Sequence, residues 1–279
     1  MTDPRSWLFV PADSERKITK ALDSNADAII FDLEDSVVPA MKPAARDLLK
    51  ALLKRSGLPE WWVRINPLGS EFIRDDLELL GIADIHGIVL PKAESGADIT
   101  ELSHRTGSIP IHAIVTETAA SLFGLSSYRQ PNSPLAAMSW GAEDLSAALG
   151  ASTKYDASGE LAFTYKLARS LCLTGAVAAG VQPVDGVFAD FKDDEGLHDE
   201  AEAARREGFA GKLAIHPAQV PIINAAFTPS PDDLRHAEEI VAAFEAHPDA
   251  GVLSVGGKMV DRPHLVQARR VLERARQES

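Results

Sequence analysis

Residues 29–36 read IIFDLEDS, an apolar run that ends in three carboxylates within four residues. An apolar run without polar alternation is typical of a parallel strand that helices cover on both faces. Asp32, Glu34 and Asp35 would then lie at the carboxyl end of this strand, where such folds carry their chemistry. Because clustered carboxylates repel one another, we expect a cation, a helix N-terminus or protonation to hold them there. The simpler alternative is that Asp35 or Ser36 only caps the next helix.

Seven further short apolar runs follow the same pattern, each ending in a polar or glycine-containing turn. They occupy residues 6–11, 61–67, 87–92, 111–117, 135–141, 184–190 and 212–217. Segments with helical spacing lie between them, among them residues 13–22, 44–53, 72–80 and 161–179. Eight strands alternating with helices predict an α/β fold, a (β/α)8 TIM barrel of roughly 250 residues. A doubly wound open sheet is the alternative, although the chain lacks the glycine-rich loops of nucleotide-binding folds.

The pattern changes near residue 231. A helix is predicted to about residue 246, then an apolar strand-like or coil segment at 251–260, then a helix at 263–276. We therefore expect a barrel domain at residues 1–230 and a C-terminal helical extension at 231–279. The segment 256–263, GGKMVDRP, has the character of a mobile loop near a site. Its simpler interpretation is a helix lead-in with Asp261 as N-cap.

Composition narrows the class of protein. Of 279 residues, 45% are hydrophobic and 25% are charged, as in a globular protein with a full core. The formal net charge of -13 opposes binding to nucleic acid. Cys172 is the only cysteine, which excludes an intramolecular disulfide and a cysteine-based zinc cluster. No apolar run approaches the roughly 20 residues of a membrane span, so we expect no membrane partner and a cytoplasmic protein.

Polar side chains follow most of the predicted strands and would converge on one face of a barrel. They are Asp32, Glu34, Asp35, Arg64, Asn66, Lys92, Glu117, Asp144, Asp190 and His216. Two carboxylates from different strands, completed by waters and substrate oxygens, suit octahedral Mg²⁺. Glu117 and Asp144 form the best pair, because each follows a strand directly and neither has a basic neighbour in sequence.

Ordered blocks along nearly the whole chain resemble the HpcH/HpaI aldolase and citrate lyase β-subunit family. The blocks are RSWLFVP at 5–11, DLEDSV at 32–37, Lys42 with Ala45 and Arg46, VRINP at 63–67, LPK at 90–92, ET at 117–118, GAEDL at 141–145, GFAGK at 208–212 and IHPAQ at 215–219. So many blocks in order are specific for the family, and much less specific for the substrate.

The resemblance implies a Mg²⁺-dependent barrel that makes or breaks a carbon–carbon bond between an acyl thioester and a 2-oxo acid. Citryl, malyl and citramalyl thioester lyases work in this way. Carried over to this sequence, Glu117 and Asp144 are the metal ligands, and Glu117 also contacts the substrate. Arg64 would hold the substrate's carbonyl or carboxylate and offset the negative charge that develops on oxygen.

Three charged residues would support this site from behind. The resemblance assigns Asp32 and Glu34 to the waters of the metal, with structural ion pairing as the alternative. Lys92 is expected to organise ion pairs around the site. A Schiff-base aldolase that uses Lys92 as its nucleophile is a further possibility.

The resemblance also places Asp261 in the site of a neighbouring subunit, as an acid or base. This implies a homo-oligomer, a trimer or a multiple of one. The small-molecule partners would be a 2-oxo acid and an acyl thioester of CoA or of a carrier protein. Ala12 stands where the family often has glycine, and its methyl group could narrow the mouth of the site.

Other functions fit the same residues. The chain could be an aldolase that acts on free 2-oxo acids without CoA, and a dependence of turnover on the thioester would separate the two. Thioester hydrolysis could follow cleavage as a further step. The alternative from another class is a partner-dependent subunit or a non-catalytic barrel that binds Mg²⁺ and ligand without turnover.

Overall fold

The computed structural model describes residues 3–52, 60–81 and 85–277. These residues fall into two compact units, which are described separately. The first is Pro4–Asn224, and the second comprises the described residues from Ala225 onward together with Asp3. The division lies within helix α9 (Gln219–Phe227), ahead of the boundary expected at residue 230.

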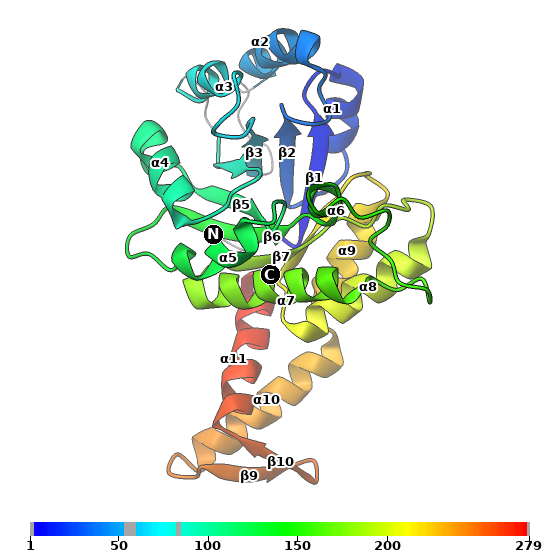
Figure 1. The fold of residues 1–279 in the computed structure, drawn as a ribbon. Helices are drawn as coiled ribbons and strands as arrows, with labels where there is room; N and C mark the ends of the chain where they lie inside the picture. Colours follow the sequence, from blue (N-terminus) through cyan, green and yellow to red (C-terminus); the bar gives the residue numbers. More distant parts are fainter. Residues whose placement is uncertain (1–2, 53–59, 82–84, 278–279) are drawn as a thin grey trace. The chain divides into compact units, whose positions relative to one another are not determined.

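The first unit is a closed barrel of eight parallel strands in chain order, in which β8 pairs with β1 (Figure 1). The strands are β1 (Ser6–Pro11), β2 (Ala28–Asp32), β3 (Glu60–Arg64), β4 (Gly87–Leu90), β5 (Ile111–Val115), β6 (Leu135–Trp140), β7 (Gln182–Asp185) and β8 (Gly211–Ala214). The predicted TIM barrel is confirmed. Every residue of β2 is buried, as expected for a strand covered on both faces.

Most strands end earlier than predicted, for a backbone reason. Lys92 follows β4 with φ 53°, and Thr116 follows β5 with φ 63°, so neither can continue an extended strand. The predicted bounds of the seventh strand, residues 184–190, are wrong: β7 begins at Gln182 and ends at Asp185. Asp190 lies instead in the turn that follows, where its carboxylate accepts the main-chain N–H of Lys192.

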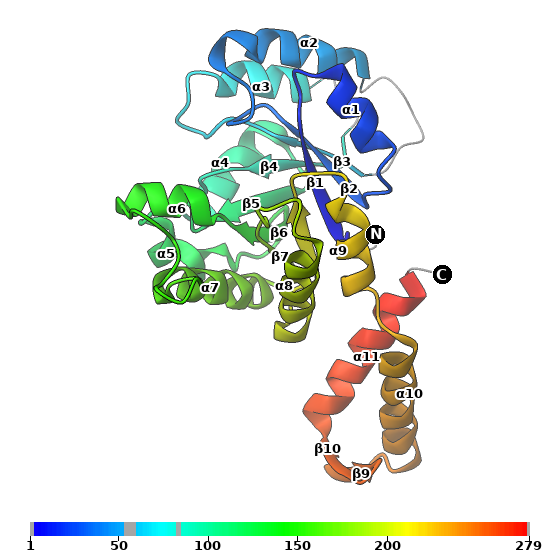
Figure 2. The ribbon, with the colours of Figure 1, turned by 90° about the vertical axis from the view of Figure 1, so that its right-hand side faces the viewer.

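Helices surround the barrel on its outer side (Figure 2). They are α1 (Glu15–Leu22), α2 (Lys42–Leu52), α3 (Ile73–Leu80), α4 (Gly96–Thr106), α5 (Ser121–Gly124), α6 (Ala142–Leu149), α7 (Phe163–Ala179), α8 (Asp194–Glu207) and α9, with 3-10 turns η1 (Pro39–Met41) and η2 (Leu125–Tyr128). Local sequence explains several starts. Ser14 caps α1, and Ser95 with Asp98 forms a capping box at α4.

Side chains fill the barrel interior, so the fold has no open pore. The interior cluster consists of Trp7, Ala28, Ile30, Trp62, Val89, Ile114, Ala137, Val184 and Leu213. His112 also lies against Trp7, with ring centroids 4.6 Å apart, and burial lowers its pKa to about 3. A packed interior leaves the loops at the carboxyl ends of the strands as the place for chemistry.

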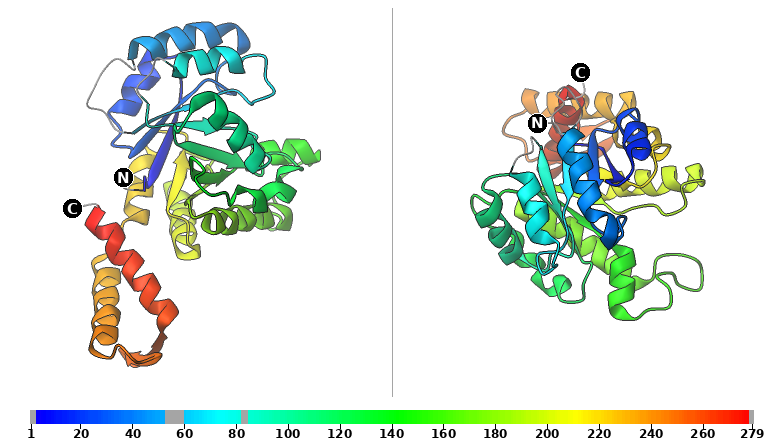
Figure 3. Two further views of the ribbon diagram at one scale, coloured as in Figure 1. Left: turned by 90° about the vertical axis from the view of Figure 1, so that its left-hand side faces the viewer. Right: turned by 90° about the horizontal axis from the view of Figure 1, so that it is seen from above.

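The second unit pairs two helices through a short hairpin (Figure 3, left). Helix α10 (Pro231–Ala246) begins after the capping residue Ser230. Strands β9 (Val252–Val255) and β10 (Lys258–Asp261) form the hairpin, and α11 (Arg262–Gln277) follows. Its core consists of Ala237, Ile240, Phe244, Val255, Val260, Leu265 and Ala268.

Within residues 3–52, 60–81 and 85–277, no helix combines the length and the apolar character that crossing a membrane requires.

Candidate active site at the carboxyl ends of the strands

An arginine from β3 is locked between two acids from β2 and the loop after it. Asp32 and Arg64 are register partners on neighbouring strands. Arg64 donates from Nε and Nη2 to the two carboxylate oxygens of Asp32, at 2.7 and 2.6 Å. Its Nη1 lies 2.9 Å from Glu34 Oε2, and its guanidinium stacks over the ring of Phe9 at 4.8 Å. All three contacts fix the plane of the guanidinium.

The ion pair with Arg64 keeps Asp32 ionised. Burial alone would raise the pKa of Asp32, but the charge and hydrogen bonds of Arg64 lower it below its usual range. Asp32 also accepts the main-chain N–H groups of Glu34 and Ser36, at 2.8 and 3.1 Å. Asp32 is therefore an ionised anchor for both Arg64 and the loop after β2.

Lys92, two residues after β4, is the second cation of the site. Its ammonium contacts the Glu34 carboxylate, lies 3.2 Å from Asp144 Oδ1 and 3.4 Å from Asp35 Oδ2. Its main-chain N–H donates to Glu117 Oε2. The left-handed backbone at Lys92 turns its N–H and its side chain toward acids that follow three different strands: Glu34 and Asp35 after β2, Glu117 after β5, and Asp144 in the first turn of α6.

Glu117 is a buried carboxylate with a raised pKa. Only 4% of its surface is exposed. Burial raises its pKa to about 8; the N–H of Lys92 opposes this shift, while Asp144 and Glu34 add to it. Gly141 lies against it, and a Cβ at that position would be 2.6 Å from Glu117 Cγ. The site therefore keeps a carboxylate where a further cation would be stabilised.

The donor set fits a hard divalent cation. Five carboxylates meet two cations here: Asp32, Glu34, Asp35, Glu117 and Asp144 face Arg64 and Lys92. Across the described part of the chain, no three His, Cys, Asp or Glu side chains form a metal cage. Oxygen donors from only one or two protein carboxylates, with waters and substrate for the rest, are the usual provision for Mg²⁺.

The structure thus brings six of the seven predicted site residues together in the first unit: Asp32, Glu34, Arg64, Lys92, Glu117 and Asp144. The seventh, Asp261, belongs to the second unit and ends β10. Its Oδ1 lies 2.5 Å from His264 Nδ1, and hydrogen bonding to His264 lowers the pKa of Asp261. His216 is exposed and stacks on Phe191 with ring centroids 5.0 Å apart.

Sequence reasoning missed three contributors to this site. Thr116 supplies the backbone turn before Glu117, and Gly141 leaves room for that carboxylate. Lys42 braces the loop after β2 and was noted only as part of a family block. Lys42 could have been found, because its spacing with Ala45 and Leu49 places a lysine on the buried face of an amphipathic helix.

Known proteins resemble this chain over nearly its whole length. The model of the HpcH/HpaI aldolase/citrate lyase family matches residues 5–217. The (3S)-malyl-CoA thioesterase of Cereibacter sphaeroides is 39% identical over 275 residues, which cover 97% of this chain and 94% of that protein. The mitochondrial citramalyl-CoA lyase of Rattus norvegicus is 32% identical over 291 residues, covering 96% and 85%.

A solved structure is also similar to this chain. The crystal structure of CitE from Mycobacterium tuberculosis in complex with magnesium, acetoacetate and coenzyme A matches with a TM-score of 0.84 and 37% identity. The match covers 97% of both chains. The similarity therefore includes the region that follows the barrel as well as the barrel itself.

Proposed function

The chain belongs to the HpcH/HpaI aldolase/citrate lyase family, and on that premise we propose that it is a Mg²⁺-dependent carbon–carbon lyase. It would cleave a 3-hydroxyacyl-CoA thioester into an acyl-CoA and a 2-oxo acid, and join the two in reverse. One observation carries the proposal: Glu117 and Asp144 both contact Lys92, in a site whose Arg64 guanidinium is already fixed in orientation by Asp32. The related CitE structure is a complex with magnesium, acetoacetate and coenzyme A, and magnesium and coenzyme A are two of the components that such a site requires.

Glu117 and Asp144 would hold the metal, and Asp32 and Glu34 would support it from behind. When bound, Mg²⁺ supplies Lewis-acid polarisation of the carbonyl of the 2-oxo acid. The charge excess of the site supports this assignment, since the five carboxylates outnumber the two cations that face them. Lys92 would keep Glu34 and Asp144 in place.

Arg64 would bind the substrate and offset charge that develops on its oxygen atoms. Asp32 and Glu34 hold its guanidinium, while 13% of its side chain remains exposed. A donor that is fixed before the substrate arrives needs no reorganisation during the reaction. This is the reason for assigning stabilisation of the enolate to Arg64.

Asp261 would move the proton, acting in the site of a neighbouring subunit. In the joining direction it takes a proton from the carbon next to the thioester carbonyl, that carbon attacks the carbonyl of the 2-oxo acid, and the resulting alkoxide takes a proton from solvent. In the lyase direction the 3-hydroxyl gives its proton to solvent, the carbon–carbon bond breaks, and Asp261 returns a proton to the acyl carbon. The assignment rests on the family resemblance, and it makes the protein a homo-oligomer, a trimer or a multiple of one. The cytoplasmic location expected from the sequence belongs to the same proposal.

Thioester hydrolysis is a second candidate, favoured by the similarity to a (3S)-malyl-CoA thioesterase. The two reactions differ in which bond breaks. Cleavage of the carbon–carbon bond of malyl-CoA yields acetyl-CoA and glyoxylate, whereas hydrolysis yields malate and free CoA. Product analysis of a single substrate therefore separates the two activities.

The test is a panel of malyl-, methylmalyl-, citramalyl- and citryl-CoA, with acyl-CoA release followed by chromatography. We expect cleavage of at least one thioester with Mg²⁺, and none with EDTA. Glu117→Ala should abolish turnover, whereas the matched variant Glu101→Ala, at an exposed acid on α4, should leave it unchanged. Turnover of free 2-oxo acids alone would favour the CoA-independent aldolase. Ligand binding without turnover would favour a partner-dependent or non-catalytic barrel.

A further inference from the structure

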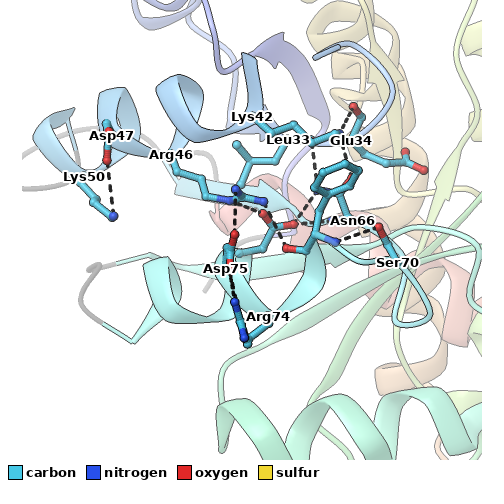
Figure 4. Close-up of polar contacts among 12 residues, drawn as sticks. Leu33, Glu34, Lys42, Arg46, Asp47, Lys50, Asn66, Ser70, Arg74 and Asp75 are labelled. Carbon is cyan, nitrogen blue, oxygen red and sulfur yellow. Dashed lines mark hydrogen bonds and ion pairs between the residues drawn. The ribbon is translucent and has the colours of Figure 1, made fainter. Parts of the chain in front are cut away.

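Lys42 is a buried lysine whose hydrogen bonds all go to neutral acceptors. Only 4% of its surface is exposed. Its Nζ donates to Leu33 O at 2.6 Å, Glu34 O at 2.9 Å and Asn66 Oδ1 at 2.8 Å (Figure 4). An ammonium has three N–H donors, so each has an acceptor. The cost of burying this charge is offset by two contacts to the main chain at Leu33 and Glu34 and one to the side chain of Asn66.

Asn66, one of the three acceptors, is itself held by hydrogen bonds. Asn66 Nδ2 donates to Asp76 Oδ2 at 2.7 Å and to Leu33 O at 3.1 Å, and its main-chain N–H also reaches Asp76. Asp76 is fully buried and accepts from Arg46 Nε at 2.7 Å. Lys42 and Arg46, one turn apart on α2, thus join the end of β2 to the segment between β3 and α3 (Figure 4).

The main-chain segment that Lys42 binds includes Glu34, whose carboxylate pairs with both cations of the site. The carboxylate of Glu34 pairs with Arg64 Nη1 at 2.9 Å and with the ammonium of Lys92. From the barrel side, Asp32 accepts the N–H of Glu34. The loop is therefore clamped between Lys42 and Asp32. A shift of the Glu34 main chain would move a partner of both Arg64 and Lys92.

We propose that Lys42 is a positioning residue for the lyase reaction: it fixes the main chain at Leu33 and Glu34 and so sets the orientation of Arg64. The inference rests on the proposed function, because the orientation of Arg64 affects turnover only where Arg64 meets the substrate. Arginine cannot replace Lys42, because a planar guanidinium does not fit three acceptors arranged around one nitrogen.

The variant Lys42→Met removes the donor and keeps a chain of similar length. Hydrogen–deuterium exchange of the peptide over residues 33–37 should become faster. We expect kcat/KM to fall by about 10- to 100-fold, the range typical of residues that orient a site from behind. Since a fixed guanidinium acts mainly in the transition state, kcat should fall more than KM rises.

Two control variants lie on the same helix. Lys50→Met changes an exposed lysine whose contact to Asp47 Oδ1 is 3.5 Å long (Figure 4). Both the exchange rate over residues 33–37 and kcat/KM should remain at wild-type values. Leu49→Val trims a fully buried side chain and should lower Tm, with kcat/KM within about two-fold of wild type. Should Lys42→Met fail to fold, Lys42→Gln keeps a shorter donor and should give a smaller effect in the same direction.

Wild-type exchange over residues 33–37 in the Lys42 variant would overturn the inference. A fall in kcat/KM no larger than that of Leu49→Val would overturn it as well. If the wild-type protein cleaved no thioester, the proposed function would fail on its own. The exchange measurement would then still decide whether Lys42 fixes the loop.

Discussion

Single residues with unusual backbone or space requirements position Glu117, the proposed metal ligand. Lys92 and Thr116 adopt positive φ angles without being glycine, at the ends of neighbouring strands. Such conformations cost roughly 1–3 kcal/mol each and persist where the surrounding structure holds them. Both place Glu117, since one supplies the N–H that binds it and the other precedes it in the chain. The strained backbone at Lys92 and Thr116 therefore determines the orientation of the Glu117 carboxylate.

Gly141→Ala should disturb the placement of Glu117 without the substitution of any charged residue. The new methyl group would lie 2.6 Å from Glu117 Cγ, closer than real contacts allow, so the carboxylate must move. We expect Mg²⁺ affinity, measured by calorimetry, to fall by at least about ten-fold. Gly81→Ala is the matched control, because its Cβ would meet only ordinary contacts beyond 3.5 Å. Equal Mg²⁺ affinity in both variants would argue against Glu117 as a ligand.

The pKa of Glu117 makes metal binding depend on pH. Its pKa of about 8 means that the metal-free protein holds this proton at pH 7 and loses it above pH 8. A metal needs the ionised form, so Mg²⁺ binding at pH 7 should release about one proton, and affinity should rise with pH up to about 8. Calorimetry in buffers of different ionisation enthalpy measures the proton count. A count near zero at pH 7 would contradict the assignment, and Glu117→Gln should show that value.

The residues at strand ends could be predicted from the sequence, but their partners could not. An acid that follows an apolar run in an α/β fold must lie at the carboxyl face, which was enough to select Asp32, Glu117 and Asp144. Glu117 and Asp144 have no basic neighbour in sequence, yet Lys92 contacts both, because β4 pairs with β5 and β5 with β6 in the barrel. Such contacts depend on the register between strands that helices separate in the chain.

At the scale of elements, a buried ion network joins the last two strands to the helices outside them. Lys212 on β8 is fully buried and donates to Asp185 Oδ2 at 2.9 Å and to Glu200 on α8 at 2.6 Å. Asp185 ends β7 and accepts from Arg169 on α7 and from the indole of Trp140, both at 2.8 Å. The sequence placed this strand end at residue 190, because an apolar stretch of loop resembled strand.

Lys212→Met should destabilise the barrel, because it leaves Asp185 buried with one cation fewer. Removing one member of a buried pair costs about 3–5 kcal/mol. Urea unfolding should show this loss, while Lys192→Met, at an exposed lysine, should be neutral. A loss below about 1 kcal/mol would show that Arg169 alone satisfies Asp185.

The same network predicts sensitivity to acid. Burial alone would raise the pKa of Asp185, but Lys212 and Arg169 lower it to about 2. Because the pKa is lower in the folded state than the ordinary 3.8, the stabilisation is present above about pH 4 and is lost as pH falls toward 2. Lys212→Met should flatten this part of the stability curve, and an unchanged curve would assign acid unfolding to other groups.

At the scale of the whole molecule, the predicted site residues are divided between two compact units. Arg64, Glu117 and Asp144 lie in the barrel, and Asp261 lies on the hairpin of the second unit. The helices and the apolar segment of this region could be predicted from periodicity, with α10 matching its predicted bounds. Periodicity carries no information about which subunit an extension serves, so the role of Asp261 in a neighbouring site stays a prediction.

Mixed oligomers test that prediction. Glu117→Ala and Asp261→Ala should each be inactive alone, because each removes one half of every site. Co-refolded in equal amounts, they should regain about a quarter of wild-type activity, since random assembly of a symmetric oligomer restores that share of sites. Light scattering should give the mass of a trimer or a multiple of it. No recovery in verified mixed oligomers would place Asp261 in its own subunit's site or outside catalysis.

The most direct measurement of the central claim follows the 2-oxo acid itself. Purified protein is incubated with the thioester selected from the panel, and the 2-oxo acid and acyl-CoA are quantified together, with EDTA and then with excess Mg²⁺. We predict that both products appear in equal amounts, disappear with EDTA and return with Mg²⁺. Release of free CoA and the intact hydroxy acid from the start, or 2-oxo acid formation that EDTA does not affect, would contradict Mg²⁺-dependent carbon–carbon cleavage at this site.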